Sequence, residues 1–228
     1  MSFKSHDRPL QAVLFDLDGT LLDTAPDMVG ALNRLRVEHG LPELAFATFR
    51  PYVSHGSLRL VREGFPDRDV AQHSALQRRF LDIYFEHLHH GTRLFPDVED
   101  VLDALAHRAV PIGIVTNKPG WLTTPLLARL GLDTRFACVV SGDTLPTRKP
   151  HPNPLLHAAR LARAQAPCCI YVGDAERDIQ AARAAGMRSL IARYGYLAPE
   201  DQPDTWQADG DIHHPAELLS WLKEHARL

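Results

Sequence analysis

The chain has 228 residues, of which 45% are hydrophobic and 23% are charged, and this balance is typical of a globular rather than a disordered protein. Its net charge of -3 offers no electrostatic basis for binding nucleic acid, which requires a basic surface. No apolar run is long enough to span a membrane, and residues 1–8 lack the apolar segment of a signal peptide, so we expect no membrane contact. The three cysteines are expected to be reduced thiols, which indicates a cytoplasmic protein.

The first predicted strand leads into the most informative stretch of the chain. Ala12–Phe15 is a continuous apolar run, which is typical of a strand buried on both faces. Asp16 and Asp18 follow at its end, where unpaired carboxylates would be costly and would repel each other. A hard divalent cation such as Mg²⁺ removes both problems, and ligands of parallel α/β sheets bind at this edge. The sequence therefore predicts a Mg²⁺ site here.

The next block, residues 22–91, is predicted to be all-helical. Apolar residues recur at helical spacing over residues 27–39 and again over 76–87, and no stretch between them resembles a buried strand. We call this block the helical insert; its roughly seventy residues suit a small domain. The predicted division is a core of residues 1–21 and 92–228 and a helical domain of residues 22–91. Arg50 and His55 flank a loop-like break in the insert and are candidates for contacting a substrate.

After the insert, strands and helices alternate. Strands are predicted over residues 110–116, 137–141, 168–173 and 189–192, with helices between them and a closing helix near residues 218–222. Residues 194–211 are predicted to be loop, because they are rich in Pro, Gly and Asp. The alternation predicts a doubly wound, Rossmann-like α/β core with a parallel sheet. Cys168 and Cys169 stand in an apolar run, which indicates buried, reduced thiols.

Further polar residues follow the predicted strands. Thr116-Asn117 ends one strand, Lys149-Pro150 precedes a helix, and Asp174 and Asp178 follow another strand where a helix begins. The carboxyl ends of parallel strands share one edge, so these distant segments can converge. Carboxylates, a lysine, a hydroxyl and a metal are the groups required for phosphoryl transfer through an aspartyl phosphate. Mg²⁺ and Lys offset the phosphate charge that repels an anionic nucleophile.

Four motifs in this order resemble those of the haloacid dehalogenase superfamily of phosphatases, and the resemblance covers essentially the whole chain. They are Asp16-Leu17-Asp18-Gly19-Thr20, Thr116-Asn117, Lys149-Pro150, and Gly173-Asp174 with Asp178. The resemblance implies that the insert is the small helical cap of the family. It also implies that Asp16 is the nucleophile and a Mg²⁺ ligand. Asp18 is then the general acid and base, with its backbone carbonyl on the Mg²⁺.

The remaining roles also come from the resemblance. Thr116 and the Asn117 backbone are expected to bind phosphate. Lys149 is expected to hold the nucleophile and the phosphate together; Lys118 and Arg148 compete for that role, and Lys149 is preferred because the proline and the helix that follow it match the motif. Asp174 is expected to bind Mg²⁺, and Asp178 to support it directly or through water.

The same motifs weigh against other activities of the superfamily. The dehalogenases lack an acid at the position of Asp18, and the phosphonatases use a lysine of the cap, whereas the insert contains no lysine. Phosphatase activity on a small-molecule phosphate ester is therefore expected. A phosphomutase and a catalytically silent binding protein remain as remote alternatives, and both a monomer and a homodimer are open.

The overall layout resembles bacterial phosphoglycolate phosphatases, including a glycine-containing loop at residues 54–56 of the insert. The stretch over residues 193–201 is more similar to the branch that contains N-acetylmuramic acid 6-phosphate phosphatase, an enzyme of peptidoglycan recycling. A phosphoglycolate-like substrate is the first expectation and the amino-sugar phosphate the alternative. Both substrates carry a carboxylate, which a cation such as Arg50 or protonated His55 would meet.

Overall fold

A computed structural model describes residues 9–226, and its centre is a parallel sheet in the order β5-β4-β1-β6-β7-β8. Every neighbouring pair in this sheet is parallel. The strands are β1 (Ala12–Phe15), β4 (Ile112–Val115), β5 (Cys138–Val140), β6 (Cys169–Gly173), β7 (Arg188–Ala192) and β8 (Gly210–Ile212). The predicted α/β fold is confirmed, and β1, with its two carboxylates at the end, lies inside the sheet.

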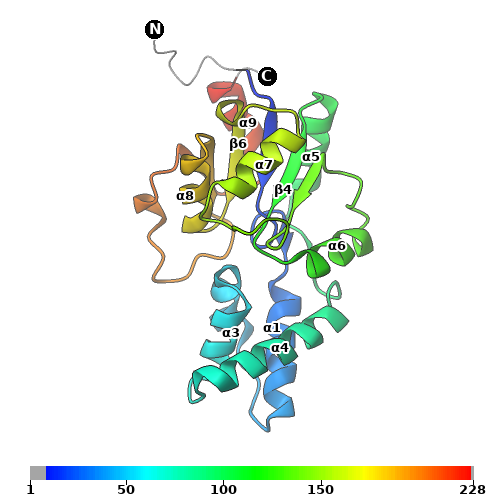
Figure 1. The fold of residues 1–228 in the computed structure, drawn as a ribbon, viewed down its shortest axis with the longest axis vertical. Coiled ribbons are helices and arrows are strands. Elements are labelled where there is room, and N and C mark those ends of the chain that lie inside the picture. Colours follow the sequence, from blue (N-terminus) through cyan, green and yellow to red (C-terminus); the bar gives the residue numbers. More distant parts are fainter. Residues whose placement is uncertain (1–8, 227–228) are drawn as a thin grey trace.

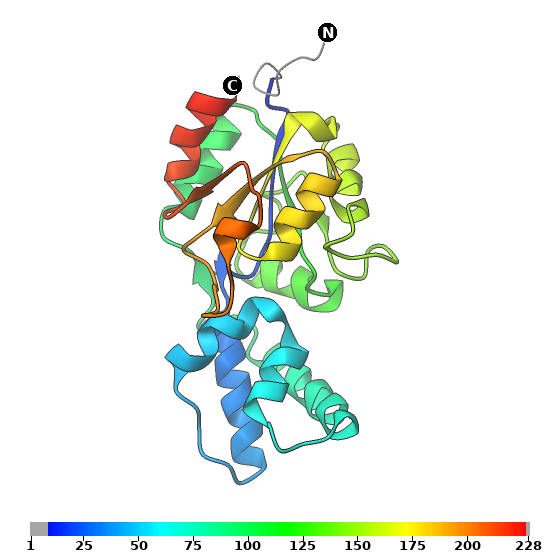
Figure 2. The same ribbon diagram turned by 90° about the vertical axis from the view of Figure 1, so that its left-hand side faces the viewer.

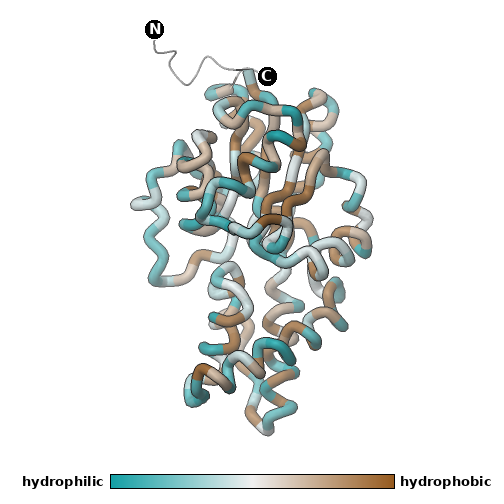
Figure 3. Tube along the Cα trace, in the orientation of Figure 1, coloured by the Kyte–Doolittle hydropathy of each residue, from teal (hydrophilic) through white to brown (hydrophobic). Residues whose placement is uncertain are grey.

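The alternation of side chains along β1 divides the core into two layers. Val13 and Phe15 belong to one apolar cluster, whereas Ala12 and Leu14 belong to the other. Apolar residues of α5 (Val98–His107), α6 (Gly120–Arg129) and α9 (Glu217–His225) join the first cluster. Those of α7 (Asn153–Leu161) and α8 (Glu176–Ala184) join the second. Because both faces are covered, the inner strands β1, β4 and β6 are apolar, and Figure 3 shows apolar stretches along the central strands.

The helical insert stands beyond the end of the sheet at which β1 ends (Figures 1 and 2). It contains α1 (Ala25–Glu38), α2 (Phe46–Phe49), the 3₁₀ helix η2 (Arg50–His55), α3 (Ser57–Gly64) and α4 (Val70–Glu86). Helix α4 begins with a capping box, in which Asp69 and Gln72 each bond the other's backbone N–H. Leu32, Leu60 and Phe80 are fully buried and pack the helices together.

The structure differs from the sequence-based expectations at three short elements. The insert was expected to hold no strand, but β2 (Leu22–Asp23) pairs antiparallel with β3 (Arg93–Leu94). Strand β8 falls partly in residues 194–211, which were expected to be loop. The loop-like break is the 3₁₀ helix η2. Strands β2 and β8 have only two and three residues, too few for a repeating side-chain pattern to be read, and they form by pairing with a neighbouring strand.

Two other expectations concern the membrane and the thiols. Within residues 9–226, no helix combines the length and the apolar character needed to cross a membrane. Residues 1–8, from which we expected no signal peptide, lie outside the described part. Two further 3₁₀ helices in the described part are η3 (Ala166–Cys168) and η4 (Pro203–Thr205). Cys138, Cys168 and Cys169 are buried free thiols, as the apolar surroundings of the last two predicted.

The two connections between core and insert are joined by one buried side chain, that of Asp27 in α1. Its carboxylate accepts hydrogen bonds from the backbone N–H of Gly91 at 2.7 Å and of Thr92 at 2.8 Å. It also accepts one from the Thr92 hydroxyl at 2.7 Å. Asp27 therefore fixes the start of the insert to its end, beside the β2–β3 pair.

Asp27→Ala is expected to lower the free energy of unfolding by about 2–4 kcal/mol, because it leaves buried N–H groups without an acceptor. Chemical denaturation, followed by circular dichroism, measures the change. Asp82→Ala, at an exposed position of α4, is the matched control and should change stability little. A loss for Asp27→Ala no larger than that of the control would contradict this role.

Candidate active site

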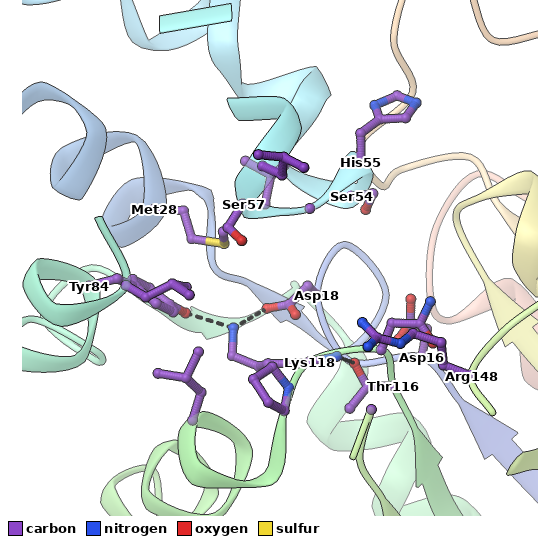
Figure 4. Close-up of a pocket in the computed structure, with 18 of the residues that line it drawn as sticks. Asp16, Asp18, Met28, Ser54, His55, Ser57, Tyr84, Thr116, Lys118 and Arg148 are labelled. Carbon is purple, nitrogen blue, oxygen red and sulfur yellow. Dashed lines mark hydrogen bonds and ion pairs between the residues drawn. The ribbon is translucent and has the colours of Figure 1, made fainter. Parts of the chain in front are cut away.

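A cavity of about 540 Å³ lies between the carboxyl ends of the core strands and the helical insert (Figure 4). The core contributes mostly charged and polar residues to its wall: Asp16, Asp18, Thr116, Asn117, Lys118, Arg148 and Arg177. The insert contributes a mixed wall that includes Met28, Ser54, His55, Ser57, Gln77, Leu81 and Tyr84. A ligand in the cavity would therefore meet charge on the core side and both apolar and polar groups on the insert side.

Three buried carboxylates converge at the core side of this cavity. Asp16, Asp174 and Asp178 each place an oxygen within 4.8 Å of the others. The ammonium of Lys149 lies 2.9 Å from Asp16 Oδ1 and 2.8 Å from Asp178 Oδ1, and its side chain is fully buried. The structure thus brings Lys149, rather than Lys118 or Arg148, onto Asp16. It also joins three of the predicted motifs in one cluster.

Asp174 has the electrostatics of a cation ligand. Its Oδ2 accepts hydrogen bonds from the Ser54 hydroxyl at 2.7 Å and from the Tyr196 N–H at 2.9 Å. Its Oδ1 is buried and has no hydrogen-bond partner among residues 9–226. Burial, together with the charges of Asp16 and Asp178, raises the pKa of Asp174 to about 8. A hard divalent cation fits this oxygen cluster, since it would occupy the open oxygen and relieve the repulsion.

Asp18 lies outside that cluster and has its own partners. Its Oδ1 accepts a hydrogen bond from the Thr24 hydroxyl at 2.7 Å and lies 3.0 Å from the ammonium of Lys118. The same ammonium donates to the Tyr84 hydroxyl oxygen at 2.9 Å, across the boundary between core and insert. Figure 4 shows Lys118 between the two. Asp18 is therefore held at the wall shared by core and insert.

The surroundings of Lys118 and Tyr84 determine the charge that each side chain carries. Burial opposes the charged form of Lys118, but the Asp18 carboxylate and Tyr84 outweigh that effect, so the pKa of Lys118 is raised. Burial is also the main cause that raises the pKa of Tyr84 to about 12. Lys118 is thus a stable cation and Tyr84 a neutral phenol near neutral pH.

The remaining motif residues are placed by backbone contacts. The Thr116 hydroxyl accepts a hydrogen bond from the N–H of Lys118 at 3.1 Å. The Asn117 side chain bonds the backbone of Lys149 twice, at 2.9 Å and 3.0 Å. This side chain therefore ties two motifs together, and phosphate binding by the Asn117 backbone stays a prediction.

The two candidates from the insert lie differently. Arg50 is not part of the cavity wall: its guanidinium lies 4.8 Å from the ring centre of Tyr196 and 3.8 Å from Asp23 Oδ2. His55 does line the cavity, but its Nε2 lies 3.4 Å from Asp201 Oδ1. In Figure 4 its ring points away from Asp16 and Asp18. The structure therefore does not bring Arg50 to the site, and His55 reaches only its rim.

Sequence reasoning missed several residues that the fold brings to the site. Arg177 belongs to none of the residues singled out from the sequence, yet its guanidinium lies 3.9 Å from Asp16 Oδ2 and lines the cavity. Ser54 and Tyr196 were not linked to Asp174. Lys118 was considered only as a rival of Lys149. The first turn of α8 aims Arg177 inward, a direction that spacing alone does not give.

Comparison with known proteins agrees with this geometry. A family model described as haloacid dehalogenase-like hydrolase matches residues 13–192, which confirms the resemblance drawn from the four motifs. The chain is 48% identical over 208 residues to a phosphoglycolate phosphatase of Xanthomonas campestris pv. campestris, covering 91% of this chain and 94% of that protein.

A more distant relative and a solved structure show the same pattern. The chain is 38% identical over 214 residues to an N-acetylmuramic acid 6-phosphate phosphatase of Pseudomonas aeruginosa, covering 93% and 95% of the two chains. A crystal structure described as a predicted phosphoglycolate phosphatase from Haemophilus somnus superimposes with a TM-score of 0.82. It is 27% identical and covers 96% of this chain and 99% of that one.

Mg²⁺ is expected to raise the melting temperature by about 5–10 °C at a concentration a hundredfold above its Kd. The gain should be larger at pH 8.5 than at pH 6.5, because below about pH 8 the cation must displace the proton that Asp174 holds. Without cation, stability should fall as the pH rises from about 4 to 8, since the folded state keeps this proton and the unfolded state loses it. Thermal unfolding in EDTA and in Mg²⁺ measures both effects.

Asp174→Asn should remove most of the gain from Mg²⁺. Asp133→Asn, an exposed position distant from the cluster in sequence, is the matched control and should keep the gain. An equal rise in melting temperature for Asp174→Asn and the unchanged protein would show that the cation binds elsewhere.

Proposed function

The chain belongs to the haloacid dehalogenase-like hydrolase family and is a phosphatase, and from this premise we propose a Mg²⁺-dependent phosphomonoester hydrolase that forms an aspartyl phosphate at Asp16. The proposed substrate is a small, phosphoglycolate-like organic phosphate. The observation that carries the proposal is the buried Asp16–Lys149 contact of 2.9 Å, which faces a cavity of ligand size. Relatives 45–48% identical that are named phosphoglycolate phosphatase support the substrate class.

The proposed Mg²⁺ ligands are the side chains of Asp16, Asp174 and Asp178, the last directly or through water, and the backbone carbonyl of Asp18. When bound, the cation would offset the charge of the phosphate beside an anionic nucleophile. Lys149 would add a second positive charge on Asp16 Oδ1. Thr116, the Asn117 backbone and the guanidinium of Arg177 would bind the other phosphate oxygens.

In the first step, a carboxylate oxygen of Asp16 attacks phosphorus and the bond from phosphorus to the ester oxygen breaks. The departing oxygen takes a proton from Asp18 and leaves as an alcohol. In the second step, Asp18 takes a proton from a water molecule as the water oxygen attacks phosphorus. The bond from phosphorus to Asp16 then breaks, which releases inorganic phosphate and regenerates both carboxyl groups in their starting states.

The helical insert, residues 22–91, is proposed to be a cap that moves on a core of residues 1–21 and 92–228. The two connections are short and adjacent, as the β2–β3 pair and the Asp27 contacts indicate. Closure would exclude water during transfer and bring insert side chains onto the organic part of the substrate. The free thiols support a reducing, cytoplasmic compartment.

N-acetylmuramic acid 6-phosphate is the second candidate substrate. The cavity of about 540 Å³ is larger than phosphoglycolate requires, and a sugar phosphate would fill more of it. His55 at the rim is a candidate partner for the lactyl carboxylate of such a substrate. The relative of this name is 38% identical, which is less than the phosphoglycolate phosphatases share with this chain.

Phosphate release in Mg²⁺ is expected to be fastest with 2-phosphoglycolate in a panel that also holds N-acetylmuramic acid 6-phosphate, hexose phosphates and nucleoside monophosphates. Asp16→Asn should abolish release from every substrate, because the nucleophile is lost while the shape of the side chain is kept. EDTA should abolish it as well. Substantial turnover by Asp16→Asn, or full activity in EDTA, is incompatible with the mechanism.

Asp18→Asn should lower kcat for 2-phosphoglycolate by roughly a hundredfold or more, the usual effect of losing general acid–base catalysis. The loss should be smaller for p-nitrophenyl phosphate, whose leaving group departs without a proton. Asp143→Asn, at the cavity wall but beside α6, is the matched control. Equal losses for both substrates would assign the proton transfer to another residue.

A further inference from the structure

Lys118 is a buried cation that lines the cavity but has no role in the mechanism above. Its side chain is 4% exposed, and its ammonium contacts Asp18 at 3.0 Å and the Tyr84 hydroxyl at 2.9 Å. An ammonium has three N–H donors, and the contacts within residues 9–226 use two of them. The third is available to a ligand in the cavity that Lys118 lines.

The other cations near the cavity are placed elsewhere. The guanidinium of Arg177 lies 3.9 Å from Asp16, on the phosphate side, and in the view of Figure 4 Arg148 is seen toward Asp16 and away from Lys118. Arg50 lies outside the cavity wall, and the ring of His55 points away from the carboxylates. Among the described residues that line the cavity, Lys118 is therefore the cation on the side where the leaving group departs.

We infer that Lys118 binds the carboxylate of the substrate and selects phosphomonoesters in which this carboxylate lies one carbon from the ester oxygen. The inference rests on the proposed function, because the position of the ester oxygen is taken from the role of Asp18. Asp18 must come within hydrogen-bond distance of that oxygen. The ammonium is 3.0 Å from Asp18 Oδ1, so it lies within two hydrogen-bond lengths, about 6 Å, of an ester oxygen that bonds Oδ1, and within about 8 Å of one that bonds Oδ2.

This reach separates the two candidate substrates. In 2-phosphoglycolate a single carbon joins the ester oxygen to the carboxylate, so the carboxylate reaches the ammonium while the ester oxygen meets Asp18. In N-acetylmuramic acid 6-phosphate the whole sugar ring lies between the phosphate and the carboxylate.

Tyr84 makes the helical insert part of this recognition. Its hydroxyl and ring hold the ammonium of Lys118 from the insert side, with the ammonium 4.6 Å from the ring centre. A phenol hydroxyl and a ring face fix the direction of the ammonium without neutralising its charge. Lys118 thus keeps its charge for the substrate, and Tyr84 acts as its positioning residue.

The test compares kcat/KM for 2-phosphoglycolate with kcat/KM for 2-hydroxyethyl phosphate, which carries an alcohol in place of the carboxylate. The unchanged protein should prefer 2-phosphoglycolate. Lys118→Met should lower that preference by roughly 10- to 100-fold, the effect of one charge-assisted hydrogen bond, mainly through KM. Lys223→Met, an exposed position of α9, removes the same charge elsewhere and should leave the preference unchanged.

Tyr84→Phe is the second variant and keeps the lysine. It should also lower the preference for 2-phosphoglycolate, by a smaller factor. If Lys118→Met does not fold, the result for Tyr84→Phe decides whether Lys118 binds the carboxylate. An unchanged preference in the folded Lys118→Met protein, with both substrates slowed equally, would show that Lys118 acts only by placing Asp18.

The proposed function fails separately from this inference. If the unchanged protein hydrolyses no phosphomonoester, the function is wrong. If it hydrolyses both esters equally well, or prefers N-acetylmuramic acid 6-phosphate, the function stands and the role of Lys118 is overturned.

Discussion

The structure depends on a concentration of buried negative charge at the carboxyl end of β1. Asp16, Asp174 and Asp178 lie within 4.8 Å of one another, and Lys149 is the cation in direct contact with two of them. Burial raises the pKa of Asp178 in spite of Lys149, and it raises that of Asp174 to about 8. Such a cluster is unfavourable by itself and becomes favourable when a cation and a phosphate bind. The fold must therefore hold these groups together.

The parallel sheet provides this support. Helices cover both faces of the sheet, so apolar packing fixes the pairing of β1 with β4 and β6. The polar residues that follow these strands take no part in that packing. Each of these three strands then delivers one polar segment to the same edge. Gly195 completes the site: a side chain there would lie 2.4 Å from the Cβ of Asp174. The segment after β7 can therefore pack against Asp174 only with a glycine at position 195.

The sequence predicted the core of this site because its signals are local. An apolar run followed by two carboxylates, and polar residues after later strands, are visible without knowing any contact. The strands β2 and β8 were missed because two or three residues are too few to show a repeating pattern of apolar and polar side chains. Arg50 was chosen for its charge, yet its guanidinium packs on Tyr196. The direction of a side chain depends on the tertiary packing, which spacing along the chain does not specify.

The residues that the sequence did not reveal share a physical feature: most act across the boundary between core and insert. Ser54 bonds Asp174 at 2.7 Å, and Tyr84 bonds Lys118, which contacts Asp18. The proposed cation ligand Asp174 thus contacts the insert directly, and the proposed acid Asp18 contacts it through Lys118. Any displacement of the insert changes the partners of both carboxylates. The placement of this helical block is therefore part of the electrostatics of the site and not only a cover over it.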